Sequence, residues 1–375
     1  MLLSFWDIIT ILVVYQCFFL CIWLWYRSKS KTVFFLIAFL LTVGLDYLSS
    51  LFYATKIVFD YPQLAFIFNA FPLLSSPLIY LYVKKRTFQF QKLSPLHFLH
   101  TVPFLCLSVW IYFNYYQYSI EEQRQILETG LETSKWQLVL IVWLGNIQIL
   151  MYLILSFLSL RIYAKEIRGY YANLEHINLN WLRLLLLGYS ALHLLNIFES
   201  FWGVSTLVQQ IYALTGLTTL LYLSLILFRG YEAAALKLER TTTIIPSENS
   251  PNEKDNNDSE KLYQTIYEEA KKLLDQPHIY TDSNLSLHLL TENLSYSERQ
   301  VSQAINQEGG MNFYDFVNQK RVEATKELLI DSKMKSKNIT QIMYEVGFNS
   351  KSSFNTAFKK YTGKTPSAFR KENSK

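Results

Sequence analysis

Two stretches in the last third of the chain carry polar side chains at spacings suited to reading DNA. Each set occupies relative positions 0, 3, 4 and 7, which fall on one face of a helix. The first set is Arg299, Ser302, Gln303 and Asn306, and the second is Ser352, Asn355, Thr356 and Lys359. Amides, hydroxyls and cations hydrogen-bond base edges in the major groove. Lys360 and Lys364 come next and suit phosphate oxygens. The pattern predicts two DNA-reading helices.

The elements that position these side chains form an internal repeat. An apolar skeleton recurs after 52 to 53 residues, so that Leu290 matches Ile342 and Val301 matches Phe354. Each copy predicts a short helix, a tight turn and a second amphipathic helix, which is the pattern of a helix-turn-helix. We place the two units at about 285–307 and 338–361.

Further helices are expected around the repeat. Residues 313–330 form a long amphipathic pattern that would hold the two units at a fixed separation, and residues 260–276 form another that ends before Pro277. The polar face of an ordinary helical domain is the simpler explanation for one such helix. Two copies with matched positions favour DNA reading.

The repeat resembles the AraC/XylS class of transcriptional regulators over residues 260–375. The likeness is strongest in 339–370, where Gly347-Phe348, Phe358-Lys359-Lys360, Gly363, Thr365-Pro366 and Arg370 stand at the family's spacings. Upstream, Arg321, Ala324 and Leu328-Leu329 match the family's linking helix, and Gly310 the turn before it. The chain departs from the family's pattern at four positions. Thr291 and Met343 replace the usual alanine in the first helix of each unit, Thr356 replaces an arginine of the second reading helix, and Gly309 replaces an apolar residue before the turn glycine.

The resemblance implies that each unit places its second helix in one of two successive major-groove turns, about 34 Å apart. It also implies transcriptional control by recruiting or blocking RNA polymerase. Weak positive charge in the first unit, where Arg299 adjoins Glu298, predicts that it contributes less affinity than the second. The class includes membrane-tethered members, which this chain resembles.

The first 230 residues predict a membrane domain. They hold 15 of the 35 Lys and Arg and 10 of the 30 Asp and Glu, although they make up most of the chain. A helix needs about 20 apolar residues to cross the hydrocarbon core. Seven segments meet this length: 5–26, 32–53, 62–83, 95–116, 136–160, 181–203 and 207–228. The fold class expected is therefore all-α, a seven-helix transmembrane bundle followed by a soluble domain of two helix-turn-helix units joined by a long helix.

Orientation follows from the basic residues in the short loops, which resist translocation. Ten lie in alternate loops after the first, third and fifth spans, against three in the other loops. This split predicts a multi-pass protein of the bacterial inner membrane with its N-terminus outside. Residues 231–259, rich in Pro, Asn, Asp and Ser, predict a flexible cytoplasmic linker to a cytoplasmic domain at 260–375.

Ionisable groups within the expected spans are candidate functional residues. His193, Asn196 and Glu199 share one side of the sixth span, and Asp46 lies in the second. These four residues predict a polar pocket for a small extracellular or periplasmic ligand. A structural hydrogen-bond network between helices is the other explanation.

No catalytic motif is recognised, and we expect neither an enzyme, nor a cofactor, nor a metal site. Cys17, Cys21 and Cys106 show no metal-binding spacing. The expected partners are double-stranded DNA, the lipid bilayer, RNA polymerase, a small-molecule ligand and a second copy in a homodimer. The alternative is a membrane receptor or transporter whose cytoplasmic helical domain docks proteins rather than DNA.

Overall fold

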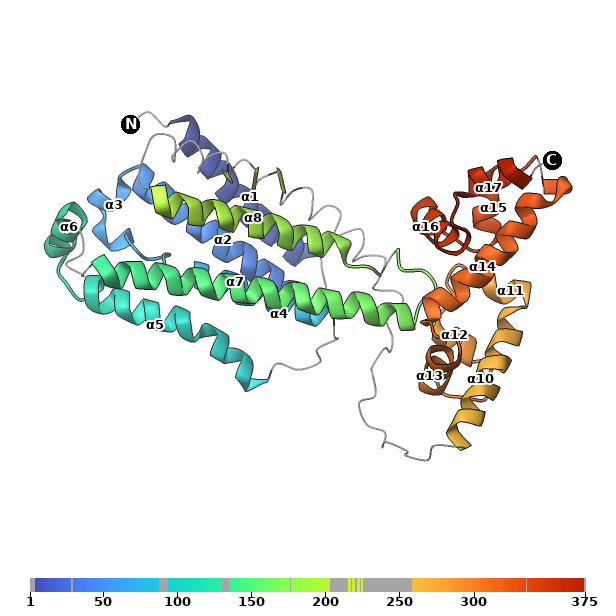
Figure 1. Ribbon diagram of the computed structural model, residues 1–375. Helices are drawn as coiled ribbons and strands as arrows, with labels where there is room; N and C mark the ends of the chain where they lie inside the picture. Colours follow the sequence, from blue (N-terminus) through green and yellow to red (C-terminus); the bar gives the residue numbers. More distant parts are fainter. Residues whose placement is uncertain are drawn as a thin grey trace. The chain divides into compact units, whose positions relative to one another are not determined.

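The computed structural model of the 375-residue chain describes residues 4–27, 30–87, 94–129, 135–175, 177–202, 215–216, 218–219, 221–222, 224, 258–334 and 336–373. The chain divides into two compact units. The first comprises Met1–Arg161 and Leu179–Glu232, and the second comprises Ile162–Asn178 and Ala233–Lys375. The described residues are helical, and their single β-bridge joins Tyr171 to Ser286 within the second unit (Figure 1).

Long apolar helices build the first unit. These are α1 (Phe5–Arg27), α2 (Val33–Ala54), α4 (Pro72–Thr87), α8 (Asn180–Trp202) and α7 (Lys135–Glu166), whose last residues belong to the second unit. Shorter helices are α3 (Ile57–Asp60), η1 (Pro62–Leu64), η2 (Pro95–Thr101), α5 (Val102–Ile111), η3 (Tyr112–Tyr116) and α6 (Ile120–Thr129). α1 and α2 approach closely because Gly44 has no side chain, and a Cβ there would lie 3.0 Å from the Cβ of Cys17.

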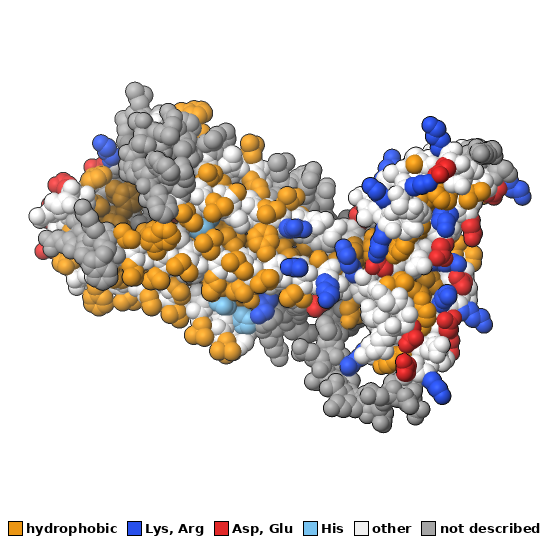
Figure 2. All heavy atoms as spheres, viewed as in Figure 1, with side chains coloured by type: hydrophobic (Ala, Val, Ile, Leu, Met, Phe, Trp, Pro, Cys, Tyr) orange, Lys and Arg blue, Asp and Glu red, His pale blue; other side chains and the backbone are white. Residues whose placement is uncertain are grey.

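Four helical segments in the described part are long and apolar enough to cross a membrane. They are Asp7–Arg27, Val33–Ala54, Pro95–Tyr116 and Val139–Gly169. Their outer surfaces carry many exposed apolar side chains (Figure 2), as a lipid-facing surface would. The four match the first, second, fourth and fifth of the seven expected spans. The seventh, 207–228, and the linker, 231–259, lie almost entirely outside the described residues.

The prediction of one continuous helix over 62–83 is wrong. The chain instead forms the short turn η1, further turns up to Phe71, and then α4 with only 16 residues. Pro62 and Pro72 each begin a helix, and Phe66 has a positive φ of 61°, which a helix cannot contain. The sixth expected span exists as α8, which is not among the four long apolar segments.

The second unit contains two helix pairs on either side of one long helix. The first pair is α12 (Leu287–Thr291) and α13 (Glu298–Glu308), and the second is α15 (Ile339–Glu345) and α16 (Lys351–Thr362). The long helix is α14 (Phe313–Ile330). The other elements are α10 (Asp258–Leu274), α11 (Pro277–Tyr280), η5 (Ser332–Met334), α17 (Pro366–Asn373) and η4 (Ile167–Gly169). The predicted repeat and linking helix are present.

Each helix pair has its own hydrophobic core. Val301 and Ile305 of α13 pack with the first half of α14, and Phe354 and Phe358 of α16 pack with its second half. All four side chains are at most 2% exposed. Burial of such a side chain contributes about 1.5 to 3 kcal/mol. Since α14 belongs to both cores, it fixes the position of one reading helix relative to the other.

Candidate nucleic-acid interface

The second reading helix, α16, presents the polar face that its sequence predicted. The hydroxyl of Ser350 caps its first turn by accepting a hydrogen bond from the amide of Ser353 at 3.3 Å. Phe354, Ala357 and Phe358 face the core. The face opposite them is exposed and consists of Lys351, Ser352, Asn355, Thr356 and Lys359. Lys351 was not among the expected residues, although its place in the first turn faces solvent.

The turn before α16 requires its glycine. Gly347 has φ of 88°, and a Cβ at this position would lie 2.7 Å from the carbonyl oxygen of Thr281. A side chain would therefore clash with the backbone of the segment between α11 and α12 as well as strain the turn. The chain passes through this turn to cross from α15 to α16 at a fixed angle.

The first reading helix, α13, begins with a capping box in which Ser297 and Gln300 exchange hydrogen bonds. Arg299 and Asn306 are exposed, and Ser302 is half-buried. Asn306 donates to the carbonyl of Ser302 at 2.8 Å, which leaves its side-chain oxygen to accept from a base. This helix thus offers fewer groups than α16.

Gln303, one of the residues expected to read bases, also makes a contact within the domain. Its side-chain oxygen accepts a hydrogen bond from the hydroxyl of Tyr263 at 2.9 Å, because α10 packs along α13 on this side. Gln303 therefore holds α13 against α10. The partner is 40 residues away in sequence, which the helical spacing alone did not reveal.

Two of the expected phosphate ligands have carboxylate partners. Lys360 pairs with Asp315 of α14 at 2.6 Å, and Lys364 pairs with Glu372 of α17 at 2.5 Å. Tyr361 also donates to the backbone carbonyl of Asp315, at 3.1 Å. The first pair ties α16 to the start of α14. Lys359 is exposed, and no ion pair is found for it among the described residues.

Arg321 connects the two halves of the domain. Its guanidinium is buried and donates to the carbonyls of Tyr280 at 2.8 Å and Asp282 at 2.7 Å. It also lies 5.6 Å from the ring centre of Phe348, which precedes α16. Burial lowers the pKa of Arg321 to about 10, so the side chain remains charged at neutral pH. Arg321, which matches a residue of the linking helix in the AraC/XylS class, thus has a structural role in this chain.

A segment from the middle of the chain, Tyr170–Ala172, completes the first core. The amide of Ala172 donates to the carbonyl of Leu285 at 3.1 Å, and the amide of Leu287 donates to the carbonyl of Tyr170 at 2.8 Å. Ala172 is 1% exposed and belongs to the core of the first helix pair. Burial, and after it the charge of Glu298, raise the pKa of Tyr170, so this segment approaches the start of α13.

Two of the four expected ligand-pocket residues line one cavity of the first unit. Asp46 comes from α2 and His193 from α8. Asn196 and Glu199 belong to α8, but their side chains lie outside the described part of the structure. Tyr47 and Tyr189 also line the cavity. We had not expected them, because tyrosines are common in apolar helices and carry no charge.

Comparison with known proteins agrees with the geometry of the second unit. Residues 290–372 match the family model described as "Helix-turn-helix domain". The C-terminal domain is a helix-turn-helix domain of the AraC type, the class found in DNA-binding transcriptional regulators. Regulators of this class are not typically enzymes.

Individual relatives share this domain. An uncharacterised HTH-type transcriptional regulator of Staphylococcus aureus (strain COL) is 30% identical over 103 residues, which cover 28% of this chain and 13% of the relative. The Msm operon regulatory protein of Streptococcus mutans serotype c is 29% identical over 118 residues, which cover 32% of this chain and 39% of the relative. The chain thus matches well under half of either protein's length.

Solved structures with similarity are also C-terminal domains of regulators. One is that of AraT, a response regulator from Geobacillus stearothermophilus, with 30% identity and a TM-score of 0.26, covering 28% of this chain and 84% of that one. Another is that of the two-component response regulator yesN from Fusobacterium nucleatum, with 34% identity and a TM-score of 0.23, covering 30% and 98%.

Proposed function

We propose that this protein is a membrane-anchored transcriptional regulator that binds specific DNA sequences through α13 and α16. The observation that carries the proposal is the exposed face of α16, on which Ser352, Asn355 and Thr356 offer hydroxyls and an amide to base edges. α13 offers Arg299 and Asn306 to the neighbouring groove. Lys359 neutralises a phosphate. RNA polymerase is the partner on which such a regulator acts, and a second copy would allow binding to paired sites.

The first unit supports membrane anchorage. Its four long apolar segments need about 30 Å of hydrocarbon to be buried. We propose the bacterial inner membrane, an N-terminus outside and the DNA-binding domain in the cytoplasm. Seven spans remain our proposal for the topology, because an N-terminus outside and a cytoplasmic C-terminal domain require an odd number of spans. Labelling of single cysteines placed at Ser4 and Ser367 in intact and opened cells tests the orientation.

Coupling between the two units is proposed to run through the segment Ile167–Ala172. This segment continues directly from α7 and its backbone pairs with residues 285 to 287 in front of α12. A change in the membrane helices therefore has a covalent path to the first helix-turn-helix unit, besides the linker that precedes α10. In this proposal a ligand in the cavity changes the membrane helices, and the segment Ile167–Ala172 passes that change to the DNA-binding domain.

The decisive experiment is selection from random duplex DNA by the full-length chain in detergent at near-physiological salt. We expect a motif with two elements one helical turn apart, of which Asn355→Ala alters only one. Tyr344→Ala, on the exposed surface of α15, serves as a matched control. If a folded chain selects no motif, the domain binds protein rather than DNA. Steep loss of affinity with rising salt separates DNA binding from protein docking.

A further inference from the structure

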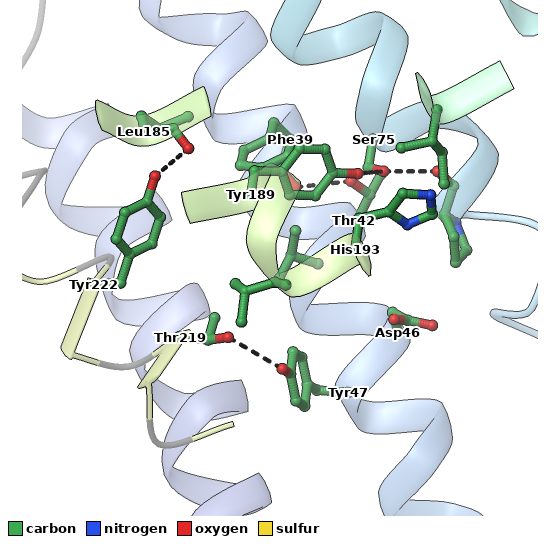
Figure 3. A pocket seen from close by; sticks show the side chains of 14 residues that line it. Phe39, Thr42, Asp46, Tyr47, Ser75, Leu185, Tyr189, His193, Thr219 and Tyr222 are labelled. Atoms are coloured by element: carbon green, nitrogen blue, oxygen red, sulfur yellow. Dashed lines mark hydrogen bonds between the residues drawn. The ribbon is translucent and has the colours of Figure 1, made fainter. Parts of the chain in front are cut away.

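The membrane unit contains a polar cavity of about 130 Å³ (Figure 3). Helices α2, α4, α7 and α8 supply most of its lining. Eight of the lining residues carry polar side chains that decide what the cavity binds: Thr42, Asp46, Tyr47, Ser75, Tyr189, His193, Thr219 and Tyr222. An engineered apolar cavity of about 150 Å³ holds benzene. The size therefore suits a ligand of about six non-hydrogen atoms.

The hydroxyl hydrogens on one side of the cavity are already used. Ser75 donates to the carbonyl of Pro72 at 2.7 Å, so in its 2.8 Å contact with Tyr189 the tyrosine is the donor. Thr42 donates to the carbonyl of Phe39 at 2.7 Å. The oxygens of these side chains retain lone pairs. They can accept hydrogen bonds from a ligand but have no hydrogen left to give.

The other side of the cavity shows the same arrangement. Thr219 donates to the carbonyl of Thr215 at 2.7 Å, so in its 3.3 Å contact with Tyr47 the tyrosine is the donor. The hydroxyl of Tyr222 donates to the backbone carbonyls of Leu184 and Leu185 (Figure 3). The hydroxyl groups on this side thus also present acceptor oxygens.

His193 adds a further acceptor. The side chain is 7% exposed, and its ring hydrogen-bonds to the backbone carbonyl of Asn146. Its Nε2 is buried without a partner, so the bond to Asn146 is made by Nδ1. In the neutral ring the nitrogen that donates carries the hydrogen, and the other holds a lone pair. Nε2 of His193 therefore awaits a donor.

Asp46 brings to the cavity a carboxyl group that carries a negative charge when it is ionised. An ionised carboxylate only accepts hydrogen bonds. No Lys or Arg belongs to the residues that line the cavity, so the counter-charge for Asp46 does not come from these side chains. A charged group among membrane helices is costly without a partner. The lining thus combines one anion with neutral acceptors.

We infer that the cavity binds a small organic ammonium ion. Its N–H groups would donate to Asp46 and to Nε2 of His193, and its charge would balance the carboxylate. The rings of Phe39, Tyr47 and Tyr189 line the same space and can stabilise a cation. This assignment rests on the proposed function, since it names the ligand class for the signal that the membrane unit senses.

Thermal unfolding of the full-length chain in a neutral detergent tests the inference. The probes are n-butylammonium chloride, n-butanol, sodium butyrate and potassium chloride at pH 7, with ionic strength held equal in all samples. A ligand that binds the folded state but not the unfolded state raises the melting temperature, and the rise grows with the logarithm of its concentration once this exceeds the dissociation constant. We expect a concentration-dependent rise with n-butylammonium alone. Equal rises with n-butanol or potassium chloride, or no rise with n-butylammonium, would overturn the inference.

A matched pair of variants locates the site. Asp46→Asn keeps the shape but removes the charge, and we expect at least a tenfold weaker response to n-butylammonium. Asp60→Asn is the control, because Asp60 is exposed and does not line the cavity. An unchanged response of Asp46→Asn would overturn the inference. The selectivity of the unaltered chain among the four probes remains decisive if Asp46→Asn does not fold.

The DNA selection separates this inference from the proposed function. It is carried out without amine, and the selected motif depends on α13 and α16 rather than on the cavity. If the chain selects a DNA motif but its melting temperature does not rise with n-butylammonium, the proposed function is supported and the ammonium site is contradicted. If the melting temperature rises but no motif is selected, the ammonium site is supported and the proposed function is contradicted.

Discussion

The backbone of Ala172 is hydrogen-bonded to the backbone of Leu285, with 3.1 Å between the amide nitrogen and the carbonyl oxygen. The two residues are 113 positions apart in sequence and belong to the same compact unit. Asn318 of α14 adds a donor at 3.5 Å from the carbonyl of Ala172. A segment that directly follows α7 is thereby part of the core of the DNA-binding domain.

Replacing Ala172 by Asp should release this segment. A carboxylate at a position with 1% exposure loses its hydration, and burying it is unfavourable by several kcal/mol. The hydrogen bond from the Leu287 amide to Tyr170 would be lost with it. We expect the Leu287 amide to exchange at least tenfold faster, measured by hydrogen exchange and mass spectrometry of the full-length chain.

The control for this change is Ala368→Asp, which adds the same charge at an exposed position of α17. It should leave exchange at Leu287 unchanged. A reporter gene under the selected motif should lose its dependence on n-butylammonium in Ala172→Asp. Retained dependence despite fast exchange at Leu287 would show that coupling runs through the linker instead.

Asn355→Ala should relax sequence preference at one element of the operator. Asn355 is exposed on α16 and can form two hydrogen bonds to adenine, a contact worth about 1 to 3 kcal/mol of discrimination. Selection from random DNA should show the preferred base at one position falling toward equal frequencies. Loss of preference at both elements together would instead indicate a change in folding, which circular dichroism would reveal.

The reading face of α16 was predictable because every contact that defines it is local. Its apolar residues recur at helical spacing, and the polar residues between them have no competing partner in the core. The same reasoning did not reveal the contact of Gln303 with Tyr263, which lies on a helix that the sequence pattern does not position. Helical periodicity shows which face is polar but not which neighbour covers part of it.

The membrane unit shows a similar division. Asp46 and His193 were identified from their charge in apolar segments, and both line the cavity. Which hydroxyl donates to which carbonyl depends on three-dimensional contacts such as Ser75 with Tyr189, 114 residues apart. The sequence therefore could not predict that the hydroxyl groups of the cavity can only accept further hydrogen bonds. The break before α4 was missed because hydropathy averages over Pro72 without registering the backbone.

Lys359→Ala and Lys360→Ala should differ in their salt dependence. Lys359 is exposed and suits a phosphate, whereas Lys360 is paired with Asp315 at 2.6 Å. Each phosphate contact contributes about 0.9 to the slope of log affinity against log salt. We expect Lys359→Ala to reduce the slope by about 0.9 and Lys360→Ala to reduce it by less than half of that. Fluorescence anisotropy on the selected duplex between low and moderate salt measures both. Equal reductions would mean that Lys360 leaves Asp315 for DNA.

Arg321→Met should loosen the connection between the two helix-turn-helix units. Methionine fills part of the space of the arginine but leaves the carbonyls of Tyr280 and Asp282 without a donor. Each buried carbonyl that lacks a hydrogen-bond donor destabilises the folded state by about 1 to 3 kcal/mol. Release of a buried charge offsets part of this loss. We expect a net destabilisation of about 2 to 3 kcal/mol.

The second unit has no tryptophan between 258 and 375, so urea unfolding is followed by hydrogen exchange of peptides from α12 to α16. Arg370→Met is the matched control. Arg370 also donates to two carbonyls, those of Lys337 at 2.7 Å and Met334 at 2.8 Å, but it is only half-buried, and both carbonyls lie just before the second helix pair. Loss of Arg370 should accelerate hydrogen exchange near α15 to α17 and leave α12 and α13 protected.

Arg321→Met should accelerate hydrogen exchange in both helix pairs, because Arg321 joins the turn after α11 to α14 beside Phe348. If α12 and α13 remain protected from exchange in Arg321→Met, the two helix pairs are held together by the apolar contacts of α14 alone.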